Sequence, residues 1–187
     1  MSKLILGFVG EIASGKGTVA KYVVEKYNAG YHRFSTPIRK VCDVLLLEQS
    51  REIMQKLSET LRANIGEDIF AKVIVDEVKK DSQEVVVVDG IRRPDDVKYL
   101  KELPNFYILN VQVDEMVRYK RLTGRKENAD DATKTLEEFR AQAEQEPERK
   151  IREIAAKADF IIDNNGDFAA TQKQVDELIS KLQKKTG

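Results

Sequence analysis

The sequence is poor in cysteine, histidine and tryptophan. Its 187 residues include one cysteine, Cys42, one histidine, His32, and no tryptophan. A single cysteine excludes an internal disulfide, and one histidine with one cysteine cannot form the usual ligand cluster of a zinc site. We therefore expect a reducing, cytoplasmic location and structural rather than chemical roles for His32 and Cys42.

The sequence also lacks an excess of charge and a long apolar run. Lys+Arg and Asp+Glu number 32 each, which argues against a broad basic surface for nucleic acid or an anionic membrane. The apolar run at residues 4–9 is too short for a signal-peptide core or a membrane span. We expect one domain, a monomer or homodimer, whose partners are small-molecule nucleotides rather than nucleic acid or membrane.

Short apolar runs alternate with helical patterns along the chain. Helical periodicity occupies residues 19–27, residues 97–103 and a C-terminal segment that contains Val175, Leu178, Ile179 and Leu182. The alternation predicts an α/β fold of three layers around a parallel sheet of about five strands. The expected strands are residues 4–9, 31–34, 85–88, 106–113 and 160–162.

Two stretches interrupt this alternation. Residues 36–80 have the pattern of three helices without a strand. Residues 124–135 are polar, begin at a glycine and lack apolar periodicity, which predicts a mobile loop. The predicted organisation is therefore a core of residues 1–35 and 81–187, a helical insertion at 36–80, and a loop at 124–135 within the core.

A glycine-rich stretch, "GEIASGKGT" at residues 10–18, follows the first expected strand directly. Gly10 and Gly15 are separated by four residues, and Lys16 follows. This is the spacing of a loop whose backbone N–H groups point at phosphates while the lysine adds a point charge. The following helix contributes its positive N-terminal end. A plain strand-to-helix turn with a solvated lysine is the alternative, but the context of strand and helix is the one that phosphate binding requires. The predicted ATP-binding residues are Gly10, Ala13, Ser14, Gly15, Lys16, Gly17 and Thr18.

The residue after Lys16 departs from the usual phosphate-loop pattern. Gly17 stands where serine or threonine is common, and the hydroxyl comes one place later, at Thr18. We therefore expect Thr18 to hold Mg²⁺ largely through water.

Four segments in the same order resemble adenylate kinases and related nucleoside monophosphate kinases. The first is "GKGT", and the second, "FSTPIRK", is similar to the start of that family's monophosphate-binding region. The third, "VVVVDGIRR", resembles its strand that ends in Asp-Gly, and the fourth, "RYKRLTGRK", is similar to the arginine-rich entry to its lid. The segment from "STPIRK" through "FAKVIVDEV" is closer to phage-type deoxynucleoside monophosphate kinases than to adenylate kinase.

This resemblance implies roles for individual residues. Thr36 and Arg39 would contact the acceptor, and Arg93 would grip the acceptor phosphate. Asp89 would organise Mg²⁺ and its waters. Arg121 would lie beside ATP, Arg125 would contact the transferring phosphoryl group, and residues 124–135 would form the lid. Lys16, Arg93, Arg121 and Arg125 are thus the expected catalytic residues.

Simpler interpretations of the same residues remain open. Asp89 with Gly90 could be only a turn, and Arg93 could be a surface charge before a proline. The basic residues around Arg118 and Arg121 could form a solvated helix face, and Arg140 could make a surface salt bridge.

Two positions also depart from the kinase family's pattern. Ala129 stands where an arginine is common before the lid's Asp-Asp pair, and Val97 stands near the position of a base-reading glutamine or asparagine. The base preference is therefore open.

The acceptor can be argued from chemistry. A monophosphate has a second pKa of about 6 and needs positioning and charge neutralisation but no general base. Alcohol kinases of this fold, such as dephospho-coenzyme A kinase, place an aspartate just after the first helix, whereas "AGYHRFSTPIRK" contains none, and Asp43 is the first candidate. We therefore predict a kinase that transfers the terminal phosphoryl group of ATP, with Mg²⁺, to a nucleoside or deoxynucleoside monophosphate. A small-alcohol kinase and an ATPase that acts as a nucleotide-dependent switch are the alternatives.

Overall fold

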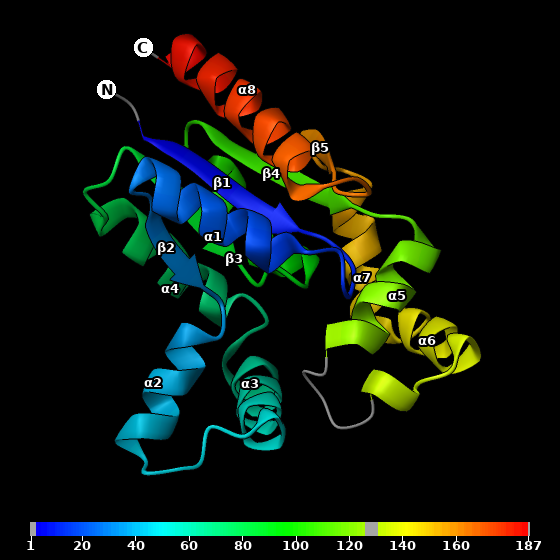
Figure 1. Ribbon diagram of the computed structural model, residues 1–187. Helices are drawn as coiled ribbons and strands as arrows, with labels where there is room; N and C mark the ends of the chain where they lie inside the picture. Colours follow the sequence, from blue (N-terminus) through cyan, green and yellow to red (C-terminus); the bar gives the residue numbers. More distant parts are fainter. Residues whose placement is uncertain (1–2, 126–130, 187) are drawn as a thin grey trace.

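The computed structural model describes residues 3–125 and 131–186. At its centre is a parallel sheet of five strands in the order β2-β3-β1-β4-β5 (Figure 1). The predicted α/β class with a parallel sheet of about five strands is confirmed. The strands are β1 (Leu4–Val9), β2 (Gly30–Arg33), β3 (Val85–Asp89), β4 (Phe106–Gln112) and β5 (Phe160–Asp163).

The central strand β1 is buried along its whole length, which explains its uninterrupted apolar sequence. It pairs with β3 on one side and with β4 on the other, where Gly7 is opposite Ile108. A Cβ on Gly7 would lie 2.9 Å from side-chain atoms of Ile91 and Phe106, so close packing requires glycine here.

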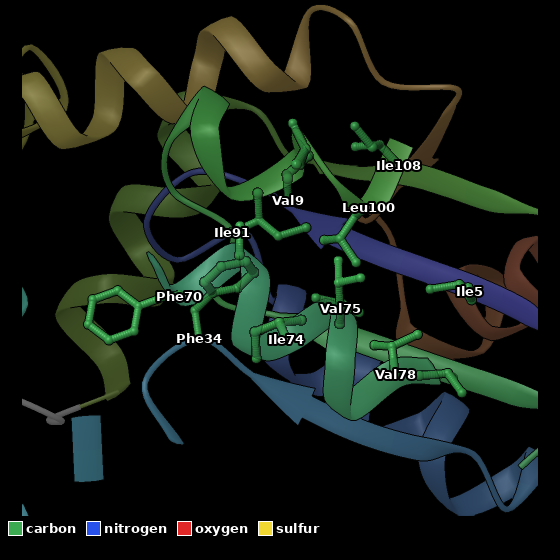
Figure 2. Packing of buried hydrophobic residues seen from close by; sticks show 14 of the residues in the cluster. Ile5, Val9, Phe34, Phe70, Ile74, Val75, Val78, Ile91, Leu100 and Ile108 are labelled. Atoms are coloured by element: carbon green, nitrogen blue, oxygen red, sulfur yellow. The ribbon is translucent and has the colours of Figure 1, made fainter. Parts of the chain in front are cut away.

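Helices cover both faces of the sheet, because alternate strand residues point to opposite sides. On one side Leu6 and Val87 share an apolar cluster with α1 and α8. On the other side Ile5 and Val86 belong to a cluster with α4 and α7, and Figure 2 shows the α4 side chains of this cluster together with Ile5 and Val9 of β1. In the part of the chain that the structure describes, no helix is both long and apolar enough to cross a membrane. The four covering helices are α1 (Lys16–Tyr27), α4 (Ile69–Lys80), α7 (Glu146–Ala155) and α8 (Phe168–Thr186).

Residues 36–80 form three helices, as predicted: α2 (Thr36–Val44), α3 (Arg51–Ile65) and α4. In Figure 1, α2 and α3 extend below the sheet, whereas α4 lies behind it, on the face opposite α1. The side chains of Phe70 and Ile74 in α4 are buried in the core cluster. Within the predicted insertion, α4 is therefore a layer of the core, and the acceptor-binding role of this region stays a prediction.

The prediction of an α-helix at residues 97–103 is wrong. Two short 3₁₀ helices replace it, η1 (Pro94–Val97) and η2 (Leu100–Glu102). Pro104 disfavours a helical backbone at Leu103, which has ψ 137°. The segment therefore ends before a regular α-helix can extend along it.

The chain between β4 and β5 is largely helical. The predicted loop at 124–135 starts inside α5, and residues 126–130 lie outside the described residues, so the closing motion of a lid stays a prediction. The elements here are α5 (Glu115–Arg125), η3 (Asp131–Thr133), α6 (Leu136–Ala143) and α7.

Candidate active site

The turn after β1 has the backbone of a phosphate-binding loop. Gly15 is the N-cap of α1 with φ 80°, and Ala13 also has a positive φ of 60°. A Cβ on Gly10 would lie 2.5 Å from Ser14 Oγ and 2.9 Å from the carbonyl oxygen of Val111. Both motif glycines are thus required by geometry, and the first N–H groups of α1 lack partners within the helix. This arrangement favours an anion at the turn.

Lys16 and Asp89 meet at the carboxyl ends of the strands, although 73 residues separate them. Lys16 is the first residue of α1, Asp89 is the last residue of β3, and the two side chains form an ion pair. The hydroxyl of Tyr31 donates to Asp89 Oδ2 at 2.7 Å, and the N–H of Gly90 donates to Oδ1 at 2.7 Å. Asp89 therefore does more than form a turn, because its side chain contacts the lysine of the phosphate-binding loop at residues 10–18, called the P-loop below.

Asp89 is ionised in this site. It is 4% exposed, and burial alone would raise its pKa. The charge of Lys16 and the hydrogen bonds from Lys16, Tyr31 and Gly90 outweigh burial and lower the pKa of Asp89 below its ordinary value. The site thus holds a buried carboxylate and a lysine beside a phosphate-binding turn.

Sequence reasoning missed two residues that β2 brings to Asp89. Tyr31 is one, and burial together with its hydrogen bond to Asp89 raises the pKa of its hydroxyl. Arg33 is the other, because β2 pairs with β3 so that Arg33 is opposite Asp89, with its Nε 3.9 Å from Asp89 Oδ2. For Arg33 the available signal was its place near the end of the strand expected at residues 31–34, since parallel strands gather their carboxyl ends at one edge. Tyr31 is the first residue of that expected strand and carried no such signal.

Asn164, which follows β5, fixes the other side of the P-loop. Its Nδ2 donates to the carbonyl oxygen of Ser14 at 2.8 Å, and its Oδ1 accepts from Thr171 Oγ1 at 2.8 Å. Arg121 Nη2 donates to the carbonyl oxygen of Asn164 at 2.8 Å, and Arg121 Nη1 is 3.8 Å from the position of a Cβ on Gly15. Arg121 therefore lies beside the P-loop, while its role with ATP stays a prediction. The polar "DNNGD" after the expected last strand was the signal for Asn164.

The predicted acceptor residues hold other partners in this structure. Arg93 Nη1 donates to Glu67 Oε2 at 3.0 Å, and Arg39 Nη1 donates to Gln49 Oε1 at 2.7 Å. Thr36 is the first residue of α2. The two arginines are thus each engaged by a different residue of the insertion, and their joint grip on a phosphate stays a prediction.

Two further predictions concern Val97, near the expected position of a base-reading residue, and Arg125, at the entry to the expected lid. Val97 is buried in the core cluster, and the base preference stays open. The side chain of Arg125 lies outside the described residues, and its predicted contact with the phosphoryl group stays a prediction.

The basic residues of α5 do not form a uniformly solvated face. Arg118 is buried, its Nη2 is 3.2 Å from Glu11 Oε2 in the P-loop, and its Nε donates to the carbonyl oxygen of Val113. The solvated interpretation is therefore wrong for Arg118. Arg140 instead makes an exposed ion pair with Glu115 at 2.7 Å, which agrees with its surface interpretation.

The described residues of this site would supply only part of the coordination shell of a magnesium ion. Among residues 3–125 and 131–186, no three His, Cys, Asp or Glu side chains gather as a metal site. Mg²⁺ that arrives with ATP needs only one or two protein carboxylates, since phosphates and water supply the other oxygens. Asp89 is a buried carboxylate of this kind, and Thr18 presents an exposed position in the first turn of α1. These hard oxygen donors fit Mg²⁺.

Comparisons with known proteins agree with this geometry. Residues 9–140 match a family model described as an AAA domain. The UPF0200 protein TK1334 of Thermococcus kodakarensis is 35% identical over 146 residues, which cover 73% of this chain and 77% of that protein. A UPF0200 protein of Methanothermobacter thermautotrophicus is 26% identical over 189 residues, 99% of this chain and 94% of that protein.

Two solved structures have the same fold. TT1252 from Thermus thermophilus has a TM-score of 0.64 at 17% identity and matches 97% of this chain and 99% of its own. Shikimate kinase from Bacteroides thetaiotaomicron has a TM-score of 0.61 at 18% identity, with 96% and 98% covered. The predicted P-loop kinase fold is confirmed, whereas the monophosphate kinase subtype is not tested by these comparisons. The chain therefore belongs to the AAA domain family, is related to the UPF0200 proteins, and is a nucleotide-binding P-loop domain with the fold of small-molecule kinases.

Proposed function

We propose that this protein transfers the terminal phosphoryl group of ATP to a nucleoside or deoxynucleoside monophosphate. The observation that carries this proposal is the identity of the residue that β2 places beside Asp89. An alcohol kinase would profit from a carboxylate there as a general base. Here Arg33 occupies the place, 3.9 Å from the Asp89 carboxylate. A cation suits an acceptor that is itself an anion.

The residues on the ATP side have roles that follow from their chemistry. Lys16 would leave Asp89 and neutralise charge on the transferring phosphoryl group. Arg121, held by Asn164 beside Gly15, would stay close to the phosphates of ATP. Bound Mg²⁺ would neutralise phosphate charge, with Asp89 and Thr18 as the protein residues that hold it and its waters.

On the acceptor side, Arg39 and Arg93 would bind the phosphate of the monophosphate. A planar guanidinium matches two phosphate oxygens at once, which a lysine cannot do. Because the acceptor oxygen of a monophosphate is already ionised near neutral pH, the site needs no base. Charge neutralisation and alignment would supply the catalysis.

A small-alcohol kinase is the second candidate, and one observation supports it. The Glu67 carboxylate lies 3.0 Å from Arg93, on the acceptor side. It could accept the proton of a hydroxyl acceptor if Arg93 released it. Asp43, the candidate from sequence, instead accepts a hydrogen bond from Gln49 at the exposed end of the insertion.

An acceptor panel tests these proposals. ADP formation is measured with ATP and Mg²⁺ alone, then with AMP, CMP, GMP, UMP and their deoxy forms, dephospho-coenzyme A and simple alcohols. We expect turnover with at least one monophosphate and little ADP without an acceptor. Turnover only with an alcohol would refute the monophosphate proposal and favour Glu67 as base, in which case Glu67→Gln would abolish it. ADP formation that no acceptor stimulates would instead identify an ATPase. Lys16→Met serves as the blank, because it should abolish all of these activities.

A further inference from the structure

Arg62 and Asp96 form a buried ion pair outside the residues assigned above. Arg62 Nη2 lies 2.7 Å from Asp96 Oδ1, and the two side chains are 6% and 2% exposed. The guanidinium of Arg62 also lies 5.0 Å from the ring centroid of Phe70. Removing two charges from water is costly, so a buried pair is weak evidence for stability by itself. Its position in the fold indicates a different purpose.

Asp96 holds the backbone that follows β3, the strand that ends at Asp89. Its Oδ2 accepts from the N–H of Arg92 at 2.9 Å and from the N–H of Arg93 at 3.0 Å. This segment comes directly after Asp89 and Gly90, where φ of 80° turns the chain. One carboxylate oxygen therefore fixes the backbone from which the Arg93 side chain extends, while the other is bound by Arg62.

Arg62 also reaches the side chain of Arg93 by a second route. Its Nη1 donates to the carbonyl oxygen of Glu67. The carboxylate of Glu67 accepts from Arg93 Nη1 at 3.0 Å. The contacts thus form a closed ring in which Arg62 acts on the backbone of Arg93 through Asp96 and on its guanidinium through Glu67.

We propose that Arg62 is a positioning residue that sets the place of Arg93 for the acceptor phosphate. The inference rests on the proposed function, in which Arg93 binds that phosphate. Arg62 belongs to α3, whereas Asp96 and Arg93 belong to the segment after β3, so the ring ties the helical insertion to the core. The ring needs a planar donor that serves a carboxylate and a carbonyl at once, which a single ammonium reproduces only in part.

The chain offers a matched control for Arg62. Arg118 is also a buried arginine, with its side chain 7% exposed and its guanidinium 5.5 Å from the ring centroid of Phe139. It too contacts a carboxylate, but that carboxylate belongs to Glu11 of the P-loop. Arg62→Gln and Arg118→Gln therefore remove the same kind of buried contact from the acceptor side and the ATP side respectively. If a variant loses activity only because the folded protein is less stable, both variants should show the same kinetic change.

Two measurements decide the proposal. The first is hydrogen exchange of the backbone N–H groups of residues 90–93 in the free protein, which include the two N–H groups that Asp96 binds. The second is steady-state kinetics, with ATP and the best monophosphate of the panel varied in turn. For Arg62→Gln we expect exchange at 90–93 to be about tenfold faster and the monophosphate KM to rise roughly tenfold, while the ATP KM changes by less than about twofold. Arg62→Lys should restore part of both effects. Arg118→Gln should leave exchange at 90–93 unchanged and raise the ATP KM.

Other results would overturn the inference. Unchanged exchange at 90–93 in Arg62→Gln would show that Arg62 does not fix this segment. Equal increases of the monophosphate KM and the ATP KM in Arg62→Gln, as in a general loss of structure, would show that Arg62 has no specific role at the acceptor site. Arg62→Lys keeps a cation at the site and carries both measurements if Arg62→Gln does not fold. If the unaltered protein phosphorylates no monophosphate, the proposed function fails, while hydrogen exchange still decides whether Arg62 positions the backbone of Arg93.

Discussion

The ion pair between Lys16 and Asp89 can be tested by a double-mutant cycle. The variants are Lys16→Met, Asp89→Asn and the combination of both. Lys21→Met is the control, because Lys21 lies in the same helix and makes an exposed pair with Glu25, at 3.5 Å. The cycle separates two roles of Lys16: its contact with Asp89 in the free protein and its contact with phosphate during catalysis.

The structure sets the magnitude of the first role. The Asp89 side chain is 5% exposed and that of Lys16 is 22% exposed, so water screens the pair only in part. A hydrogen bond to a charged group contributes roughly 1.5–3 kcal/mol, and Asp89 keeps its donors Tyr31 and Gly90 when Lys16 is lost. We therefore expect Lys16→Met to lower the free energy of unfolding by about 1.5–3 kcal/mol. At about 2–4 °C per kcal/mol, the melting temperature falls by roughly 3–12 °C.

Chemical unfolding at pH 7 measures these free energies, and ADP formation measures turnover. The double variant should be more stable than the sum of the single losses predicts, by a coupling energy of about 1–3 kcal/mol, because neither partner is then left without the other. Its turnover should stay as low as that of Lys16→Met, since the phosphate has lost its cation. Lys21→Met should change neither quantity by much. Additive losses of stability would refute the ion pair, and recovered turnover in the double variant would refute the role of Lys16 in phosphoryl transfer.

Three further predictions concern the acceptor site, the P-loop and pH. Arg39→Ala and Arg93→Ala should each raise the monophosphate KM by roughly one to three orders of magnitude, about 1.5–4 kcal/mol, with smaller effects on ATP in steady-state kinetics; changes below about twofold would make both arginines surface charges. Gly15→Ala should abolish ATP binding in calorimetry, because Gly15 has φ 80° and a Cβ there would lie 2.5 Å from Asn164 Nδ2; ordinary ATP affinity would contradict this close approach. Since the folded-state pKa of Asp89 lies below its unfolded value of about 3.9, its contribution to stability is present above about pH 4 and is lost as the pH falls through the folded pKa. The stability difference between the unaltered protein and Asp89→Asn should therefore narrow in acid unfolding experiments, and a constant difference would disprove that shift.

Local chemistry in the sequence determined the elements and the P-loop. The apolar run at residues 4–9 predicts a strand buried on both faces, and β1 is buried at every position. The spacing of Gly10, Gly15 and Lys16 predicts a phosphate-binding turn, and the required close approaches at both glycines are present. Such features depend on neighbouring residues, so the sequence carries them without knowledge of the tertiary structure. The prediction of an α-helix at 97–103 is wrong, because Pro104 disfavours a helical backbone at Leu103 and the segment forms two short 3₁₀ helices instead.

Tertiary structure decided which charges meet. Strand order places β2 beside β3, and this alone brings Tyr31 to Asp89 from 58 residues away. The ion pair of Arg62 and Asp96 joins residues 34 apart and depends on how α3 packs against α4 and α4 packs against η1. Periodicity marks the buried face of a helix but does not say which element covers it, and a charged residue gives no local sign of its partner. The sequence therefore identified Lys16 and Asp89 of the candidate site. Their neighbours Tyr31 and Arg33 were found only in the tertiary structure, because the parallel sheet gathers residues from different strands near one edge.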